Sequence, residues 1–435
     1  MTGGQGTMEQ TSKRRLALHW QILIAIALAV VAGLLAGEDG AVFGVTFYSV
    51  FDFIGRLFLN ALKMLIVPLI ASSMIVGVAG IGSGGALGRL GGRTLLIYAG
   101  TGLAAIVLGL AIVNVVQPGV VDGRPAGEML ALEVEGKDVA SMIGDRDASD
   151  IVEIFVRMIP ENVVAAASDN GEVLAVIFFS LLFGAFIPRL APDKSQVLLS
   201  FWKGVFDVMT MMTEWIMKAA PVGVFGLVAK VVAKAGLAAA APLAVFAGCV
   251  LVSLAIHLFV TLPLFIKLTT GLRPWPIFPA MAPALLTAFS TASSNATVPV
   301  TLDCVEKRAG VSNRIASFVI PLGATINMNG TALYECAAVL FIAQAYGVDM
   351  SLFTQFTVVV LALMTSVGVA GIPAASLVAI AIILTAVGLP PEAIGVLFVF
   401  DRILDMARTA VNVAGDAFAA VIVAKLEGEK GILGQ

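Results

Sequence analysis

Five polar side chains interrupt an apolar stretch near the C-terminal end of the chain, within DRILDMARTAVNVAGDAF. They are Asp401, Asp405, Arg408, Asn412 and Asp416, and successive members are four, three, four and four residues apart. At roughly 100° of rotation per residue, a helix gathers all five within a sector of about 80°. A single charge at the bilayer centre costs roughly 3 kcal/mol on insertion scales. Five polar groups on one face therefore indicate a cavity that holds water, an ion or a charged ligand.

Arg408 and Asp405 suit a ligand that carries charges of both signs. A guanidinium group binds a carboxylate in a bidentate manner. A carboxylate three residues earlier can accept an α-ammonium group. The pair therefore predicts a zwitterion with an additional acid group. The alternative is an internal ion pair between Asp405 and Arg408, because three-residue spacing brings two side chains together on a helix.

A second polar stretch, GATINMNGTALYE, covers residues 323–335. Its glycines and asparagines weaken a helix, and an unwound turn would free backbone carbonyl groups next to Asn and Thr oxygens. Hard cations such as Na⁺ favour several neutral or anionic oxygens, by analogy with other hard-cation sites. The last two members of the polar face, Asn412 and Asp416, can complete such a cage. The alternative is that these polar groups only hold helices together.

Glu335 is a lone carboxyl group in apolar sequence. Burial disfavours the charged form of a carboxyl group, so Glu335 is a candidate proton carrier. The alternative is a structural hydrogen bond.

The composition places these residues in a membrane. Of 435 residues, 59% are hydrophobic and 13% are charged, and the mean hydropathy is +1.00. Soluble domains have about 25% charged residues, so we expect an all-α polytopic membrane protein. The three cysteines have no metal-binding spacing and are interpreted as unpaired packing residues. The two histidines lie too far apart in the sequence to suggest a metal site.

Apolar segments of spanning length divide the chain. They lie at 16–37, 45–80, 94–117, 151–190, 195–217, 222–268, 314–347 and 391–425. We expect a tag at 1–10, helices one to three in 11–117, a polar extracellular loop at 118–150, helices four to six in 151–268, a transport core at 276–425 and a cytoplasmic tail at 426–435.

Two further apolar segments, 276–300 and 354–389, are broken in the middle by STASSNATVP and TSVGVAGIPAAS. A continuous helix tolerates Pro299 or Pro373 poorly. Irregular backbone at membrane depth is acceptable only where it faces protein or water. Each break therefore predicts a re-entrant hairpin whose polar tip faces a binding site, to which its half-helix ends add their dipoles. Each hairpin is followed by a polar helix, and such paired units point to inverted repeats around a transport site.

Basic residues in short loops predict the orientation. Those that we expect on the cytoplasmic side are Lys13, Arg14, Arg15, Arg89, Arg93, Arg189 and Lys194. Both termini are then cytoplasmic, and the 118–150 loop is outside. The first apolar run is long enough to span and lacks a small-residue cleavage site, so we expect no cleavable signal peptide. The expected location is the plasma membrane, or the inner membrane of a bacterial cell.

Several motifs resemble one family, the dicarboxylate/amino acid:cation symporters, which include archaeal aspartate transporters and mammalian excitatory amino acid transporters. The matching motifs are SxxSSxxTxPVT in 290–301, GATINMNGTALYE in 323–335, GxAGIP in 368–373 and DxxLDMxRTxVNVxGD in 401–416. The likeness covers nearly the whole chain apart from the tag and the 118–150 loop. It implies eight transmembrane helices, two re-entrant hairpins, a homotrimer, and a transport part that moves like an elevator against a scaffold.

The resemblance also implies a substrate site. Its members would be Ser294, Thr331, Gly371, Ile372, Asp405, Arg408, Thr409 and Asn412. Arg408 would bind the side-chain carboxylate of the substrate, with Thr331 nearby, and Asp405 would bind the amino group. Asn412 and Thr409 would contact the main-chain carboxylate and amine. Ser294 and the backbone of the second tip would close over the ligand.

Two Na⁺ sites are implied in the same way. One would use Gly323, Asn327, Asn412 and Asp416, and the other would use Thr325, Ser366 and Val367, largely through the backbone.

A third Na⁺ site of the family is incomplete in this sequence. Tyr98 and Thr101 match the family pattern, but Asn329 stands where an Asp is usual and Gly102 where a hydroxyl residue is usual. The asparagine still has a carbonyl oxygen, so weak binding of Na⁺ is the alternative to loss of the site. Ala292 also stands where archaeal members have an Arg. Glu335 matches the mammalian members, whose carboxylate is tied to H⁺ and K⁺ coupling.

The function expected from the sequence is symport of aspartate or glutamate driven by Na⁺, with H⁺ and K⁺ as further candidate coupling ions. The alternatives are a carrier of C4-dicarboxylates, which would not need Asp405, and a carrier of neutral amino acids, which would leave Arg408 unpaired. Two rivals belong to other classes: an anion channel, and an intramembrane aspartyl enzyme using Asp405 and Asp416, which lie about three turns apart on one helix. We expect membrane lipid and no nucleic acid among the partners, and no enzymatic activity.

Overall fold

The computed structural model describes residues 18–79, 85–130, 132, 156, 158–168, 173–368 and 375–435. The predicted tag at 1–10 lies outside these residues. In the described part the chain is helical, and its only strands form two short antiparallel hairpins. An all-α architecture is therefore confirmed.

The N-terminal half contains α1 (Leu18–Ala36), β1 (Ala41–Val42), β2 (Val45–Thr46), α2 (Phe47–Lys63), α3 (Ile66–Ala79), α4 (Gly85–Val116), β3 (Val120–Val121), β4 (Arg124–Pro125), α7 (Val163–Ala167), α8 (Val173–Phe186), η2 (Ile187–Arg189) and α9 (Pro192–Met217). The C-terminal half contains α10 (Ala220–Ala235), η3 (Gly236–Ala239), α11 (Ala240–Ile256), η4 (His257–Thr261), α12 (Leu262–Thr270), α13 (Ile277–Thr291), α14 (Ser294–Lys307), α15 (Asn313–Ile326), α16 (Asn329–Ala345), α17 (Leu352–Gly368), α18 (Ala375–Ala386), η5 (Pro391–Leu397), α19 (Phe398–Leu426) and η6 (Ile432–Gly434).

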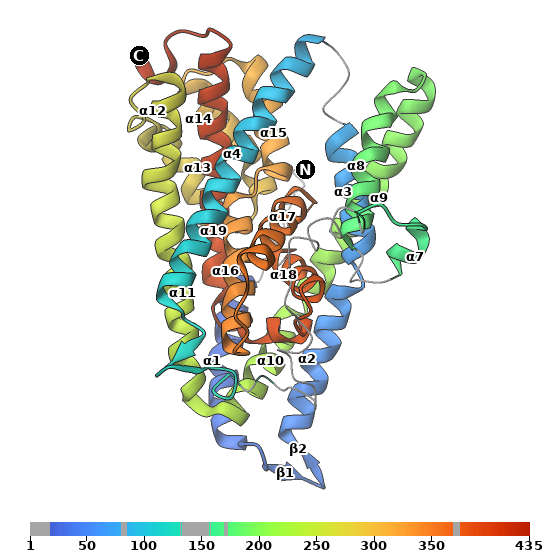
Figure 1. Cartoon of the computed structure of the whole chain (residues 1–435), viewed down its shortest axis with the longest axis vertical. Coiled ribbons are helices and arrows are strands. Elements are labelled where there is room, and N and C mark those ends of the chain that lie inside the picture. Colours follow the sequence, from blue (N-terminus) through green and yellow to red (C-terminus); the bar gives the residue numbers. More distant parts are fainter. Residues whose placement is uncertain are drawn as a thin grey trace, which may run out of the picture.

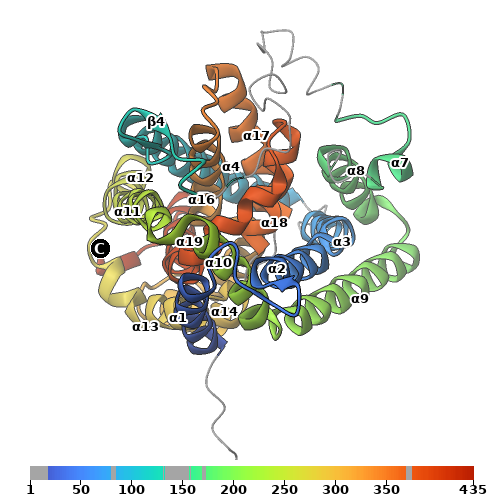
Figure 2. The same cartoon turned by 90° about the horizontal axis from the view of Figure 1, so that it is seen from below.

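The helices form two groups on either side of a central set (Figures 1 and 2). On one side α3 packs against α8 and α9, and on the other α13 packs against α14 and α19. Near the β1–β2 end, α10 packs against both α1 and α2. Helices α16 and α19 lie between these groups (Figure 2).

Five helical stretches in the described residues are long and apolar enough to cross a membrane. They are Phe47–Ala79, Arg89–Val116, Ala220–Thr270, Asn313–Ala345 and Pro391–Leu426, and shorter apolar helices accompany them. The chain is therefore a multi-pass membrane protein, while the count of eight transmembrane helices stays a prediction.

Segments 45–80 and 222–268 each contain more than one helix in the structure, and these divisions were not predicted from the sequence. Segment 45–80 breaks between α2 and α3, where Pro68 cannot donate a hydrogen bond to the carbonyl of Met64. Segment 222–268 breaks between α10 and η3, where Gly236 has a φ of 61°. A positive φ favours glycine because it has no Cβ.

The first broken segment forms a helical hairpin, as predicted, from α13 and α14. The turn is at Ala292, which has a φ of 50°, and at Ser293, whose side chain caps α14 by accepting a hydrogen bond from the Ala296 N–H. Pro299, which the sequence suggested as the cause of the break, lies inside α14. The small polar residues of the tip, rather than the proline, mark the turn.

The second broken segment forms α17 and α18, which pack against each other. Its tip, residues 369–374, lies outside the described residues.

The predicted loop at 118–150 and the predicted tail at 426–435 both make hydrogen bonds to the C-terminal half of the chain. In the described part of the 118–150 loop, the Gly119 N–H donates to Gln344 Oε1 at 3.2 Å. In the 426–435 tail, the Leu433 N–H donates to the Ala309 carbonyl at 2.8 Å, and Ile432 is buried. The tail therefore packs on the loop between α14 and α15.

Helix α16 is the most enclosed element, since every residue in it except Gln344 is buried. Glycines permit its close contact with α19. A Cβ at Gly330 would lie 2.8 Å from the Arg408 carbonyl oxygen, and a Cβ at Gly415 would lie 2.9 Å from Asn329 Nδ2. Polar groups on these two helices are therefore hidden from lipid.

The contact between α2 and α10 has a direct test in Gly223→Ala. A Cβ at Gly223 would lie 2.2 Å from Phe58 Cγ, and overpacking of this kind costs about 1–3 kcal/mol. We expect a lower melting temperature for the purified protein in detergent. The matched control is Gly204→Ala in α9, where no atom lies within 4 Å of the added Cβ. Equal melting temperatures for the two variants would contradict this packing.

Candidate functional site

The polar face predicted at the C-terminal end lies on one helix, α19, and four of its five members are buried. The fifth, Asp405, has a side chain that is 14% exposed. This confirms that the polar face turns inward. It meets the break between α15 and α16, which the sequence identified as the second polar stretch.

Arg408 is the largest buried side chain in the described part of the molecule, with 1% of the residue exposed. Its Nη2 lies 3.0 Å from Asp401 Oδ1 and 3.1 Å from Asp405 Oδ1. Its Cζ lies 3.9 Å from the centre of the Tyr334 ring. Within the described residues, Nε and Nη1 have no hydrogen-bond partner. The internal ion pair left open by the sequence is therefore present, and two nitrogens remain to bind an anion.

Asn412 and Thr409 continue this face. Asn412 Oδ1 accepts a hydrogen bond from the Gly330 N–H at 2.8 Å, and its Nδ2 donates to Thr331 Oγ1 at 3.1 Å. The Thr409 hydroxyl donates to the Asp405 carbonyl at 2.8 Å. Thr331 and Asn412 are thus brought together, and α16 begins against α19 through a direct hydrogen bond.

The predicted unwound turn is confirmed at Asn327 and Met328, which separate α15 from α16. Their ψ angles are 74° and 55°, far from helical values. Asn327 Nδ2 donates to Asp416 Oδ1 at 2.9 Å, while Asn327 Oδ1 is buried and lacks a partner in the described structure. A Cβ at Gly323 would lie 2.2 Å from Asp416 Oδ1, so the carboxylate packs directly on the backbone. Carbonyl, amide and carboxylate oxygens gather here, as a hard cation requires.

Thr325, Ser366 and Val367 lie on two helices, α15 and α17, that are in contact. The hydroxyl of Thr325 donates to the Leu322 carbonyl at 2.9 Å, and that of Ser366 donates to the Leu363 carbonyl at 3.0 Å. Both hydroxyl groups thus bond within their own helices, which leaves their oxygen lone pairs for another ligand. A shared cation site here stays a prediction.

The residues of the doubtful third cation site come together around α4 and α16. The Tyr98 hydroxyl donates to the Val319 carbonyl at 2.7 Å, and the Thr101 hydroxyl donates to the Ile97 carbonyl at 2.9 Å. A Cβ at Gly102 would lie 3.3 Å from Asn329 Oδ1. Asn329 Nδ2 is buried and unpaired among the described atoms. Asn329 has a carbonyl oxygen but no negative charge, so this place is less suited to Na⁺ than one built around a carboxylate.

Glu335 is fully buried in α16. The Thr365 hydroxyl lies 2.9 Å from Glu335 Oε2 and also 2.9 Å from the Leu361 carbonyl. Glu335 Oε1 has no partner in the part of the chain that is described. The predicted structural hydrogen bond is present, and one oxygen remains free to carry a proton.

Of the two predicted hairpin tips, only the first lies within the described residues. Ser294 is buried and is the first residue of α14, which packs against α19. Gly371 and Ile372 lie outside the described residues, and so does the side chain of Val367.

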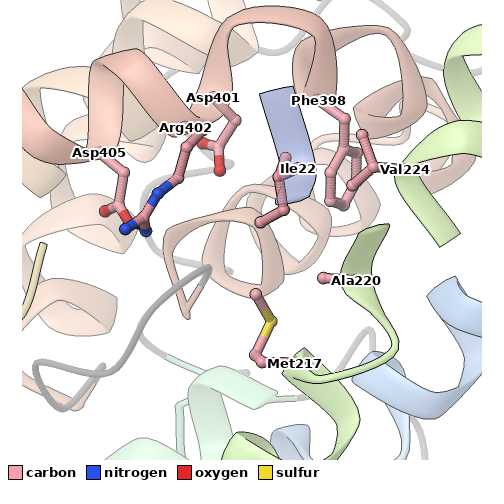
Figure 3. Close-up of a pocket in the computed structure, with 8 residues that line it drawn as sticks. All are labelled: Ile22, Met217, Ala220, Val224, Phe398, Asp401, Arg402 and Asp405. Atoms are coloured by element: carbon pink, nitrogen blue, oxygen red, sulfur yellow. The ribbon is translucent and has the colours of Figure 1, made fainter. Parts of the chain in front are cut away.

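A cavity borders the polar face where α19 meets α1 and α10 (Figure 3). Its lining residues are Ile22, Met217, Ala220, Val224, Phe398, Asp401, Arg402 and Asp405. Arg402 and Tyr334 were not among the site residues predicted from the sequence. Arg402 was detectable, because an ionisable residue within a membrane segment indicates function by default. No sequence signal marked Tyr334, since an aromatic residue in an apolar helix is ordinary.

Comparisons with known proteins identify the family to which this chain is similar. A family model described as "Sodium:dicarboxylate symporter family" matches residues 18–426. A proton/sodium-glutamate symport protein of Bacillus caldotenax is 36% identical, over 96% of this chain and 96% of its own length. A proton/glutamate-aspartate symporter of Escherichia coli is 33% identical, over 95% and 93%. Rabbit (Oryctolagus cuniculus) excitatory amino acid transporter 3 is 36% identical, over 95% and 87%.

Proposed function

The chain belongs to the sodium:dicarboxylate symporter family, and we propose that it imports aspartate or glutamate together with Na⁺. One observation carries this proposal: Arg408 is buried beside Asp405, and two of its nitrogens have no hydrogen-bond partner among the described residues. Such a pair fits a molecule with an ammonium group and an extra carboxylate. The similarity to symporters of glutamate and aspartate supports the same substrate class.

In this proposal, Arg408 binds the side-chain carboxylate of the substrate near Thr331, and Asp405 binds the amino group. Asn412 and Thr409 contact the main-chain carboxylate and amine. Ser294 from the first tip, and the backbone of Gly371 and Ile372 from the second, close over the ligand. The turn at Ser293 and Ser294 beside α19 supports the first of these closing contacts.

Na⁺ would bind where oxygens converge beside the broken helix. One ion would use Gly323, Asn327, Asn412 and Asp416, and the unpaired Asn327 Oδ1 next to the Asp416 carboxylate supports this site. A second ion would use Thr325, Ser366 and Val367, largely through the backbone, and the contact of α15 with α17 supports it. Bound Na⁺ would balance the charge that the acidic substrate brings into the membrane.

The wider assembly follows the family in this proposal. It comprises eight transmembrane helices, two re-entrant hairpins, cytoplasmic termini, a homotrimer in the plasma membrane, and an elevator movement of the transport core. The hairpins α13–α14 and α17–α18 beside the central helices α16 and α19 support this arrangement.

A C4-dicarboxylate carrier of the same fold is the second candidate. The ion pair between Arg402 and Asp405 favours it, because Asp405 already has a cation partner without a substrate amino group. A neutral amino acid would leave the free nitrogens of Arg408 without an anion, which disfavours that alternative.

The proposed function predicts uptake of aspartate or glutamate into proteoliposomes under an inward Na⁺ gradient. Arg408→Gln removes charge-assisted hydrogen bonds worth about 1.5–3 kcal/mol each, so we expect substrate affinity to fall at least about tenfold. Arg189→Gln, at an exposed position in η2, is the control and should keep wild-type uptake. An absence of uptake of both amino acids by the wild-type protein would refute the proposal.

The Asn329 and Gly102 pair predicts that fewer Na⁺ ions move with each substrate than in relatives with the complete third site. The physical reason is that Asn329 has no negative charge and Gly102 has no hydroxyl group to ligate a cation. Reversal potentials measured in proteoliposomes give the number of ions. A value of three Na⁺ per substrate would contradict this prediction.

The buried carboxyl group of Glu335 leads us to expect that H⁺ takes part in the transport cycle. K⁺ is a further candidate coupling ion. In Glu335→Gln the site cannot exchange a proton, so we expect net transport to lose its pH dependence. Glu214→Gln changes an exposed carboxyl group in α9 and serves as the control. An unchanged pH profile in Glu335→Gln would exclude Glu335 as the proton carrier.

A further inference from the structure

Arg402 is a buried cation for which the proposed function has no role. Its side chain is 9% exposed, in the first two turns of α19, where the next residue, Ile403, is exposed. Its Nη1 lies 3.5 Å from Asp405 Oδ2, and its Nε has no partner in the described part of the structure. A guanidinium group at this depth is costly, so its place beside Asp405 requires an explanation.

Two guanidinium groups hold Asp405 from opposite sides. Arg408 Nη2 lies 3.1 Å from Oδ1, and Arg402 Nη1 lies 3.5 Å from Oδ2. Each carboxylate oxygen therefore has one cationic partner, and a substrate ammonium group would compete with these two partners for Asp405. Arg402 is the weaker of the two, because its contact is longer. Arg408 is also held by Asp401 and by the Tyr334 ring.

Arg402 itself borders a small cavity of about 20 Å³, which is room for about one water molecule. The cavity beside it is bordered by Ile22 of α1 and by Ala220 and Val224 of α10, and Asp401 contributes a carboxylate to the same wall (Figure 3). Two carboxylates, those of Asp401 and Asp405, therefore border the cavity that Arg402 lines. The long alkyl stem of Arg402 suits the apolar part of the wall.

The charges in this part of α19 are balanced as they stand. Asp401 and Asp405 carry two negative charges, and Arg402 and Arg408 carry two positive charges. An amino acid brings its own ammonium group to Asp405 and makes Arg402 redundant there. A dicarboxylate without an amino group leaves Arg402 beside Asp405, so the Asp405 carboxylate keeps both of its cationic partners.

We propose that Arg402 is a tethered cation that occupies the amino-group side of Asp405, and that it lets the same site accept C4-dicarboxylates without an amino group. The proposal rests on the proposed function, in which Arg408 binds the carboxylate and Asp405 binds the amine. It makes Arg402 a specificity-determining residue. Its presence weakens binding of aspartate, with which it competes, and strengthens binding of succinate, whose missing ammonium group it replaces.

The test compares the inhibition constants of succinate and unlabelled aspartate against uptake of labelled aspartate. In Arg402→Gln, a bound succinate leaves Asp405 Oδ2 buried without a cation, so we expect succinate to bind at least about tenfold more weakly. Aspartate should bind more tightly, because its ammonium group has no competitor. Arg402→Lys keeps the charge and should keep succinate as an effective inhibitor, which a purely structural role would not require.

The outcomes separate this proposal from the proposed function. A succinate-to-aspartate ratio of inhibition constants that is the same in Arg402→Gln and wild type would overturn the role of Arg402 alone. An equal loss of affinity for succinate and for aspartate in Arg402→Gln would overturn it as well. If Arg402→Gln does not fold, the same inhibition assay on the wild-type protein tests the proposal. Failure of succinate to inhibit aspartate uptake at a thousandfold excess over aspartate would then overturn it. Absence of aspartate uptake by wild type would instead refute the proposed function.

Discussion

The burial of the Arg408 guanidinium group is the constraint on which the rest of the core depends. An arginine at membrane depth must have carboxylates, an aromatic face or a ligand around it. Here Asp401 and Asp405 lie on the same helix at 3.0 and 3.1 Å, and the Tyr334 ring covers the group at 3.9 Å. Since Tyr334 belongs to α16, this arrangement holds only while α16 and α19 stay in contact. Glycines at positions 330 and 415 allow that contact.

The same contact positions the cation-binding groups. Asn412 ties the first turn of α16 to α19, and Asp416 receives a hydrogen bond from Asn327 in the unwound turn. Both helices therefore serve the anion-binding guanidinium group at one end and the oxygen cluster at the other. A substrate that orders Arg408 and Thr331 also fixes Asn412, which belongs to the proposed Na⁺ cage. This shared side chain gives a physical route by which substrate and Na⁺ can favour each other's binding.

Much of this site follows from the sequence, because helical spacing of polar residues in an apolar segment is a strong signal. The inward face of α19, the unwound turn at Asn327 and the first hairpin were all predicted from such patterns. The division of residues 45–80 and 222–268 was missed, since a continuous apolar run hides a break set by one proline or one glycine. The turn of the first hairpin lies at Ala292 and Ser293, within the small and polar break predicted from the sequence, and Pro299 lies inside α14. Tyr334 was missed because its importance depends on the Arg408 side chain that faces it across the fold, whereas Arg402 was missed although an ionisable residue in an apolar segment is itself a signal.

The central claim is that an acidic amino acid and Na⁺ bind together at the α16–α19 contact. The most direct measurement is the melting temperature of the purified protein with aspartate or glutamate, with Na⁺ or with choline in its place, and with both ligands together. A ligand that binds only the folded state raises the melting temperature. The account predicts a large increase only when the amino acid and Na⁺ are present together. Equal stabilisation by the amino acid in choline and in Na⁺ would contradict it.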